Sequence, residues 1–77
     1  MTLCFVLLNI KAGFVEAVVK ELNQIPEVKE AYAVTGGIDI ITKIEGADIE
    51  TIAKTILAKL HKINGVERTR THIVIPI

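Results

Sequence analysis

The chain has 77 residues, a length that predicts one domain spanning residues 1–77. Nine acidic residues balance nine basic ones, so the formal net charge is zero. Domains that bind nucleic acid directly usually have a clear basic excess, so we expect no direct binding to DNA or RNA. Cys4 is the only cysteine, which excludes an internal disulfide and a multi-cysteine metal site.

The apolar content is high for so short a chain. Hydrophobic residues make up 51% of the sequence, yet a domain of this size buries only about 60% of the surface that its unfolded chain exposes. The excess suggests faces that are buried against copies of the same chain. The apolar run around Cys4 is too short to span a membrane and lacks the features of a signal peptide. We therefore expect a cytoplasmic protein with no membrane contact.

The chain is predicted to begin with a strand and a helix. Residues Thr2–Ile10 are rich in β-forming residues and apolar on both faces, which is typical of a central strand. From Phe14 to Ile25 the apolar residues recur at helical spacing, with charged residues on the other side. Pro26 is predicted to end this helix.

A hairpin is predicted next. Residues 28–35 and 38–45 indicate two strands, and the Gly36-Gly37 pair lies between them. Glycines adopt the positive φ values that a tight hairpin turn requires. The pattern therefore predicts two adjacent antiparallel strands with a short connection.

The second half of the chain predicts another helix and a last strand. Asp48 is a good N-cap, and an apolar stripe runs from Ile49 to Ile63 before Asn64-Gly65 ends the helix. Residues 66–77 indicate the final strand. The order β-α-β-β-α-β predicts an α+β, ferredoxin-like sandwich: a four-stranded antiparallel sheet with two helices on one face and the first and third strands in the centre.

This layout leaves one face of the sheet without a helical cover. Positions 3, 5 and 7 of the first strand are as apolar as positions 4, 6 and 8, so both faces of that strand are apolar. An exposed apolar sheet face is an interaction surface. We therefore predict that the chain dimerises by packing one sheet against another.

Common catalytic and cofactor chemistry has little support in the sequence. There is no serine nucleophile and no phosphate-binding loop, and neither His61 nor His72 has a second ligand at metal spacing, so we predict no metal, no cofactor and no catalytic residue. His61 is expected to be solvated. An RNA-recognition module has the same strand order, but it needs stacking aromatic residues on its third strand, and none occurs here.

Two polar clusters remain as candidates for function. The first is Thr35-Gly36-Gly37-Ile38-Asp39 on the hairpin, and the second is "RTRTH", residues 68–72, in the last strand. They are interpreted either as a turn and an edge strand with threonines on one face and arginines on the other, or as a binding site. Backbone N–H groups at the glycines could hold a carboxylate, Asp39 could hold an ammonium group, and the threonines could adapt to either. Together these groups could bind the ammonium and carboxylate groups of a free amino acid.

The stretches "AYAVTGGIDIITKIE" and "INGVERTRTHIVI", joined by a helix, resemble the effector domain of the Lrp/AsnC family, also called the RAM domain. The resemblance covers essentially the whole chain. It is carried by Thr35-Gly36-x-x-Asp39 on the hairpin and by Gly65-Val66 followed by Thr69-x-Thr71. The sequence resembles a stand-alone version of the domain, without the DNA-binding helix-turn-helix of full-length regulators.

The resemblance implies dimers formed through the sheets, commonly four dimers in an octamer, with amino-acid effectors bound between dimers. Carried over to this sequence, it implies a ligand site at Gly36, Asp39 and Thr71, with Gly37 and Thr69 beside them. The family often has an acidic or polar residue and then an aromatic residue before the aspartate. Here Gly37 and Ile38 occupy those positions, which alters the wall of the cleft.

Three hypotheses follow from these patterns. The leading one is an amino-acid-sensing and oligomerisation module that is not an enzyme and that joins or modulates full-length Lrp/AsnC-type transcription regulators. The second is a small dimeric ferredoxin-like enzyme, an oxygenase or isomerase, with an enclosed pocket lined by His72, Tyr32 or Asp39. The third is a structural assembly partner without a ligand. A cleft between dimers would favour the first, and a closed cavity within one subunit the second.

Overall fold

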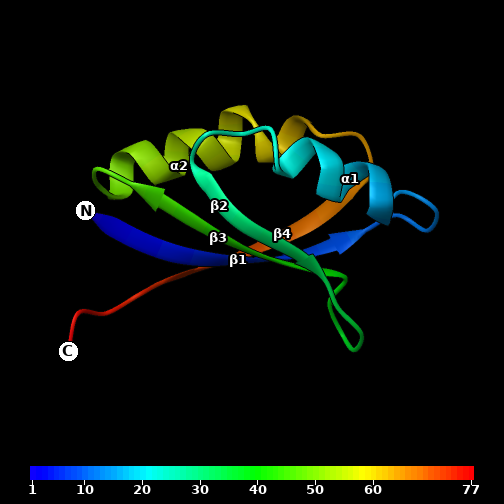
Figure 1. Cartoon of the computed structure of the whole chain (residues 1–77), viewed down its shortest axis with the longest axis horizontal. Coiled ribbons are helices and arrows are strands. Elements are labelled where there is room, and N and C mark those ends of the chain that lie inside the picture. The colour runs from blue at the N-terminus through cyan, green and yellow to red at the C-terminus, as the bar shows by residue number, and fades with distance from the viewer.

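The structure is a computed structural model that describes all residues, 1–77, and it has two layers. A four-stranded sheet forms one layer, and both helices lie on the same face of it (Figure 1). In chain order the elements are β1 (Thr2–Ile10), α1 (Val15–Leu22), β2 (Val28–Ala33), β3 (Ile40–Gly46), α2 (Ile49–Ala58), the short 3₁₀ helix η1 (Leu60–Lys62) and β4 (Val66–Ile73). The predicted ferredoxin-like order is confirmed.

The strands are arranged in the order β2-β3-β1-β4, and every neighbouring pair is antiparallel. The central strands β1 and β3 pair without interruption from Thr2 opposite Gly46 to Leu8 opposite Ile40. The outer strands β2 and β4 each have one register shift. The two strands predicted to be central are therefore central, and β4 is an edge strand.

The hydrophobic core lies between the sheet and the helices. Alternate residues of β1 point toward the helices and are fully buried, and those of β3 do the same. Burial removes water from the Cys4 thiol and raises its pKa. The core consists of thirteen buried hydrophobic residues: Cys4, Val6, Leu8, Ile10, Val18, Leu22, Val28, Ile40, Ile44, Ile52, Ile56, Leu60 and Ile63.

The helices are shorter than the sequence predicts. After Leu22 the backbone hydrogen bonds shorten to three-residue steps, from Gln24 N–H to Glu21 O and from Ile25 N–H to Leu22 O. The first helix therefore ends in a tight turn before Pro26 is reached. The second helix also ends early, at Ala58, because the chain tightens after it into η1. The last residues of the predicted apolar stripe therefore lie beyond α2.

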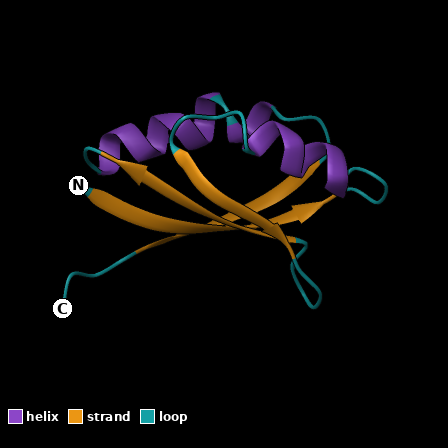
Figure 2. Ribbon diagram, viewed as in Figure 1, coloured by secondary structure: helices purple, strands orange, loops and turns teal.

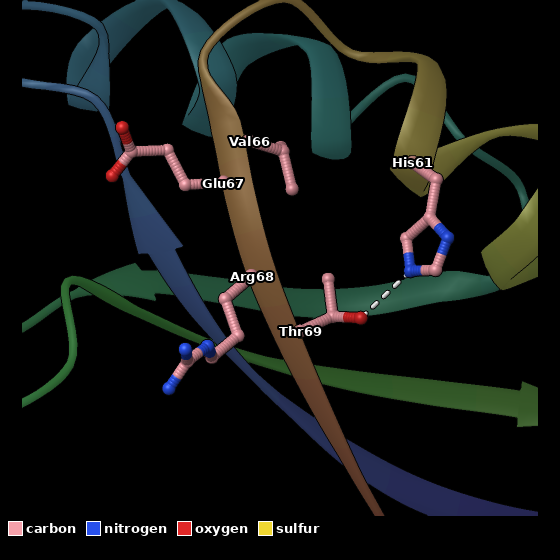
Figure 3. Close-up of a pocket in the computed structure, with 5 residues that line it drawn as sticks. All are labelled: His61, Val66, Glu67, Arg68 and Thr69. Atoms are coloured by element: carbon pink, nitrogen blue, oxygen red, sulfur yellow. Dashed lines mark hydrogen bonds between the residues drawn. The ribbon is translucent and has the colours of Figure 1, made fainter.

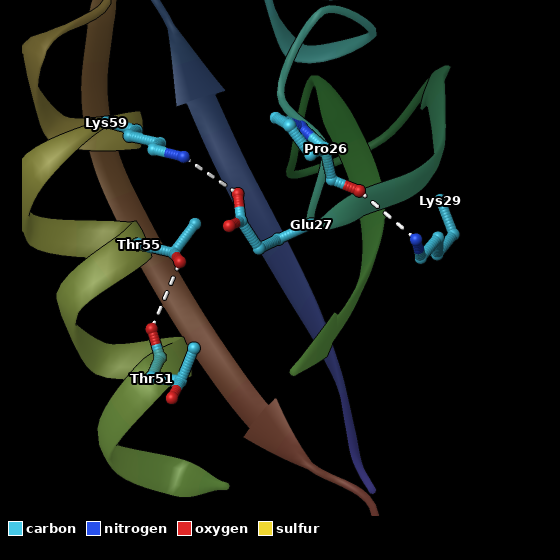
Figure 4. A network of polar contacts seen from close by, with 6 residues as sticks. All are labelled: Pro26, Glu27, Lys29, Thr51, Thr55 and Lys59. Carbon is cyan, nitrogen blue, oxygen red and sulfur yellow. Dashed lines mark hydrogen bonds and ion pairs between the residues drawn. The ribbon is translucent and has the colours of Figure 1, made fainter. Parts of the chain in front are cut away.

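Polar contacts fix the position of α2. Asp48 caps it as predicted, since its Oδ1 accepts a hydrogen bond of 2.7 Å from the Thr51 N–H. At the C-terminal end of α2, Lys59 Nζ lies 2.9 Å from Oε1 of Glu27, the residue that precedes β2 (Figure 4). This hydrogen-bonded ion pair lowers the pKa of Glu27. The contact joins two segments that are far apart in the sequence.

A close contact at Gly65 joins the start of β4 to the start of α1. Gly65 has φ of +102°, and a Cβ added there would lie 2.6 Å from the Cβ of Phe14. Its carbonyl oxygen also accepts a hydrogen bond of 2.7 Å from the Lys11 N–H. Only glycine combines this backbone conformation with this lack of space. The glycine of the Gly65-Val66 motif therefore has a structural role.

The face of the sheet opposite the helices is uncovered, and we call it the open face. The loop between β2 and β3 and the C-terminal tail after β4 both extend to this side of the sheet, at opposite ends of it (Figure 2). Phe5 is 37% exposed at the centre of the open face. The predicted unpartnered apolar face is present on β1 and is extended by Ile41 of β3. The rest of the open face is polar: β3 adds Lys43 and Glu45, and β4 adds Arg68, Arg70 and His72.

Candidate functional site

The loop between β2 and β3 is wider than the predicted tight hairpin, because the strands stop at Ala33 and Ile40. The Val34 N–H donates to the Asp39 carbonyl at 2.9 Å, and the Asp39 N–H turns away to donate to the Leu8 carbonyl of β1 at 2.9 Å. Only one of the two glycines, Gly36, has a positive φ, at +116°. The prediction that the pair forms a tight turn is therefore wrong, and the loop is held by β1 as well as by β2.

The side chain of Asp39 is held by a hydrogen bond to β1. Its Oδ2 accepts a hydrogen bond of 2.7 Å from the Ile10 N–H, and the contact is partly buried. The last paired residues of β1 and β3 are Leu8 and Ile40. The Asp39 carboxylate extends the contact between these two segments to Ile10, two residues further along β1. The carboxylate is thereby held in a fixed orientation at the edge of the loop.

The loop also borders a polar cleft on the open side of the sheet. The Asn9 side-chain N–H donates to the Gly37 carbonyl at 3.0 Å, which fixes the loop against the end of β1. A cleft of about 430 Å³ lies there, and its lining residues are Asn9, Gly37, Glu67, Arg68 and Arg70. Two guanidinium groups beside one carboxylate can bind an anionic group such as a carboxylate. The arginines of "RTRTH" were assigned no binding role from the sequence.

The threonines of β4 lie on the other face of the sheet. Thr69 is opposite Leu8 in the register and Thr71 is opposite Val6, so both point to the helix side. The predicted alternation of threonines and arginines is confirmed. Thr69 Oγ1 lies 2.7 Å from Nε2 of His61, and the two are hydrogen-bonded (Figure 3). His61 is exposed, as expected, but it is also tied to β4.

Two more hollows lie on the helix side of β4. The first has a volume of about 300 Å³ and is bordered by His61, Val66, Glu67, Arg68 and Thr69 (Figure 3). The second is an apolar groove of about 330 Å³ between α2 and β4, lined by Ile49, Ile52, Ala53, Ile56, Leu57, Thr71 and Ile73. Thr71 is the only polar residue in that groove.

Within one chain, the five predicted ligand residues do not share one cavity. Gly37 borders the polar cleft, Thr69 borders the His61 hollow and Thr71 lies in the apolar groove. Gly36 and Asp39 line none of these cavities. Gly36, Gly37, Asp39 and Thr69 lie toward the end of the sheet where β4 begins and the β2–β3 loop turns, whereas Thr71 lies further along β4, opposite Val6.

The open face carries a polar cluster that the sequence did not reveal. The Tyr32 hydroxyl donates to Glu30 Oε1 at 2.8 Å, and Lys43 Nζ lies 3.3 Å from Glu30 Oε2. The hydrogen bond from Tyr32, followed by the contact with Lys43, lowers the pKa of Glu30. The same bond raises the pKa of Tyr32. The i, i+2 spacing of Glu30 and Tyr32 on one strand was the available signal.

The residues named for an enzymatic pocket do not enclose one. His72 and Tyr32 are exposed on the open face, and neither lines any of the cavities. No group of three or more histidine, cysteine, aspartate or glutamate side chains is placed to hold a metal ion. None of the helices has both the length and the apolar character needed to span a bilayer.

The chain is similar to known transcription regulators in sequence and in structure. It is 36% identical over 75 residues to the HTH-type transcriptional regulator FL11 of Pyrococcus furiosus, a match that covers 97% of this chain and 49% of the regulator. The chain thus spans about half the length of the curated relatives that it matches. The crystal structure of FFRP-DM1 superposes with a TM-score of 0.93 at 36% identity, covering 97% of this chain and 100% of the other.

A more distant structure has the same fold. A transcriptional regulator from Neisseria meningitidis, solved as a complex with L-Met, has a TM-score of 0.87 at 22% identity, over 97% of this chain and 50% of that one. The family model described as "Lrp/AsnC ligand binding domain" matches residues 3–76. The chain therefore belongs to the Lrp/AsnC family, as its ligand-binding domain.

Proposed function

We propose that this chain is a small-molecule-sensing and oligomerisation module whose effector is a free amino acid. The observation that carries the proposal is the match of residues 3–76 to a ligand-binding domain whose relatives are transcription regulators. A regulator-type domain of this kind acts by binding and assembly, so we propose no catalytic role. Its setting would be cytoplasmic, with full-length Lrp/AsnC-type regulators as partners.

The proposed assembly begins with a dimer formed through the open face. Leu3, Phe5 and Leu7 of β1 lie on that face together with Ile41 of β3. Apolar side chains in a continuous central strip favour burial against a second sheet. Four such dimers would then form the octamer that the family resemblance implies.

The proposed ligand site contains Gly36, Gly37, Asp39, Thr69 and Thr71, completed by a neighbouring subunit. The support for this site is that Gly37 and Thr69 border open hollows beside the start of β4, while Thr71 borders an open groove nearer the end of that strand. Hollows of this kind become enclosed when another subunit covers them. Asp39 would hold the ammonium group, since its carboxylate is fixed by Ile10.

The test is a denaturant-midpoint screen with each free amino acid at millimolar concentration, L-methionine included. A ligand that binds only the native state at 100 times its Kd adds about 2.7 kcal/mol to the free energy of unfolding. We expect one or a few amino acids to raise the midpoint. If none does, the amino-acid proposal is wrong, and the ligand-free assembly partner becomes the better description.

A matched variant separates binding from folding. Asp39→Asn keeps an oxygen that can accept the Ile10 N–H but removes the negative charge. We expect it to fold normally and to lose the midpoint shift caused by the amino acid. An unchanged shift in Asp39→Asn would show that the carboxylate does not hold the ammonium group.

A further inference from the structure

The polar cleft beside the start of β4 is not explained by the proposed amino-acid site. Of the residues assigned to that site, only Gly37 borders the cleft, and the Asp39 carboxylate is bound to Ile10 instead. The cleft has a volume of about 430 Å³ and no apolar side chain in its lining. Binding sites for most small molecules are mainly apolar. A wholly polar lining suits a compact ligand that is charged over most of its surface.

An extra residue in β4 shapes one wall of the cleft. Arg68 pairs with Asn9 of β1, whereas the next pair along the two strands joins Val66 to Ile10. Glu67 is therefore an extra residue without a partner in β1, which makes this a β-bulge, an irregularity that redirects side chains and is frequent beside functional sites. Figure 3 shows that Glu67 and Arg68 project to one side of β4, while Val66 projects to the other.

Two arginines supply the positive charge of the cleft. Arg68 and Arg70 are two residues apart on β4, so their side chains leave the same face of the strand about 7 Å apart. Both are exposed, and neither takes part in an ion pair, since every ion pair of the chain is made by a lysine. No side-chain hydrogen bond involves either guanidinium. Two sets of donors therefore border the cleft without a partner in the protein.

The other lining residues fix the cleft and limit its charge. Asn9 donates one amide hydrogen to the Gly37 carbonyl at 3.0 Å, which leaves its second amide hydrogen as a free donor. Glu67 adds one carboxylate to the two arginines, so the lining has a net charge of +1. The cleft therefore attracts an anion, and Glu67 weakens that attraction.

We infer that the polar cleft binds a phosphate group, as the free ion or as a small monoester, between Arg68 and Arg70. A guanidinium group pairs with two oxygens of an anion at once. A phosphate monoester has three terminal oxygens, so two guanidinium groups can bind it from different sides, whereas both oxygens of a carboxylate are taken by one. A phosphate group also carries close to two negative charges at neutral pH, which matches two arginines.

The position of the cleft limits the ligand further. The cleft lies at the edge strand β4, whereas the apolar strip of the open face follows the central strand β1. The chain as a whole has a net charge of zero, so it lacks the wider basic surface that a nucleic-acid backbone requires. The ligand is therefore a small phosphate compound. This inference does not depend on whether an amino acid binds at Asp39.

The test is a titration of the chain, labelled with nitrogen-15, followed by two-dimensional NMR at constant ionic strength. At a pH of about 8 a phosphate group carries nearly two negative charges. The probes are inorganic phosphate, glycerol 3-phosphate and malonate, a dicarboxylate of similar charge. We expect both phosphates to cause saturable shifts at Gly37, Arg68 and Arg70, and malonate to bind more weakly. Tighter binding of inorganic phosphate would identify the free ion as the ligand, and the reverse order would identify a monoester.

Charge variants test the named side chains. Arg70→Gln removes one guanidinium, so the dissociation constant for phosphate should rise about threefold to tenfold. Arg68→Gln should have the same effect and replaces Arg70→Gln if that variant fails to fold. Glu67→Gln removes the repulsive carboxylate, so it should lower the dissociation constant by about threefold. Lys20→Gln is the matched control, because it removes one exposed positive charge on α1 and should leave phosphate binding unchanged.

Several results would overturn the inference. They are the absence of saturable shifts with either phosphate, malonate binding as tight as phosphate binding, and an unchanged dissociation constant in the arginine variants. An equal loss of binding in Lys20→Gln would also contradict it, because binding would then follow the net charge of the chain rather than the cleft. The amino-acid proposal is tested separately by the denaturant screen, so a failure of one is distinguishable from a failure of the other.

Discussion

At the scale of single residues, Gly65 is the position where the backbone least tolerates a side chain. Its φ is +102°, and an added Cβ would lie 2.6 Å from Phe14 Cβ. We expect Gly65→Ala to lower the free energy of unfolding by about 1–3 kcal/mol from backbone strain alone, with the clash adding to it. Denaturant unfolding of Gly65→Ala beside Gly37→Ala checks this, because Gly37 has no positive φ and no neighbour within 4 Å. Equal midpoints for the two variants would contradict it.

Asp39 shows why a residue substitution must be chosen from the structure. Asp39→Ala leaves the Ile10 N–H without its partner, and a buried unpaired donor costs about 1–3 kcal/mol. We therefore expect Asp39→Ala to be less stable than Asp39→Asn, which keeps an acceptor. Thermal or denaturant unfolding without ligand measures the difference. Identical stabilities would mean that the Ile10 contact contributes little.

At the scale of elements, the start of α2 depends on the Asp48 cap. The hydrogen bond from the Thr51 N–H holds the pKa of Asp48 below its ordinary value, so the folded state favours the ionised form. A lowered pKa gives stability that is fully present above the ordinary aspartate pKa of about 3.9 and is lost as pH falls through the lower value of the folded state. We expect Asp48→Ala to lower the denaturant midpoint at pH 7.

The pH dependence supplies the control for that prediction. The wild type and Asp48→Ala should differ most at neutral pH, and the difference should shrink as the pH falls below about 3.9, where the carboxylate of the wild type becomes protonated. Denaturant midpoints of both proteins between pH 7 and pH 2 measure this. A difference that stays constant over the whole range would show that the cap contributes through packing rather than through its charge.

The elements also show what could be predicted from the sequence and what could not. The run of β-forming residues along Thr2–Ile10 and the Asp48 cap are local signals, and both elements were predicted at their correct starts. The end of α1 was not, because the chain tightens after Leu22 into three-residue hydrogen-bonded steps while Ile25 still packs against the core. The β2–β3 loop was predicted too tight, since its geometry depends on hydrogen bonds to β1 that are remote in sequence.

The candidate site was predictable only in part for a related reason. The sequence could place Thr69 and Thr71 on one face and the arginines on the other, because β-strand alternation is local. It could not show that His61 bonds to Thr69 or that Arg68 and Arg70 share a cleft with Gly37, because these contacts join separate elements. A site completed by a second subunit is harder still to predict from the sequence, because it depends on contacts between chains.

At the scale of the whole molecule, the open face makes stability depend on protein concentration. If dimers form through it, unfolding releases two chains, so each tenfold rise in concentration stabilises the dimer by about 1.4 kcal/mol. We expect the denaturant midpoint of the wild type to rise accordingly between low and high micromolar concentration. Phe5→Glu should lose this dependence, because it places a charge at the centre of the face where Phe5 is 37% exposed.

The matched control for this last prediction lies on the opposite side of the molecule. Ala17 is exposed on α1, away from the open face, so Ala17→Glu adds the same charge without touching the proposed interface. Its midpoint should keep the concentration dependence of the wild type. A concentration dependence that survives in Phe5→Glu, or that disappears in Ala17→Glu, would place the interface on the helix side, where the apolar groove between α2 and β4 is the surface available for it.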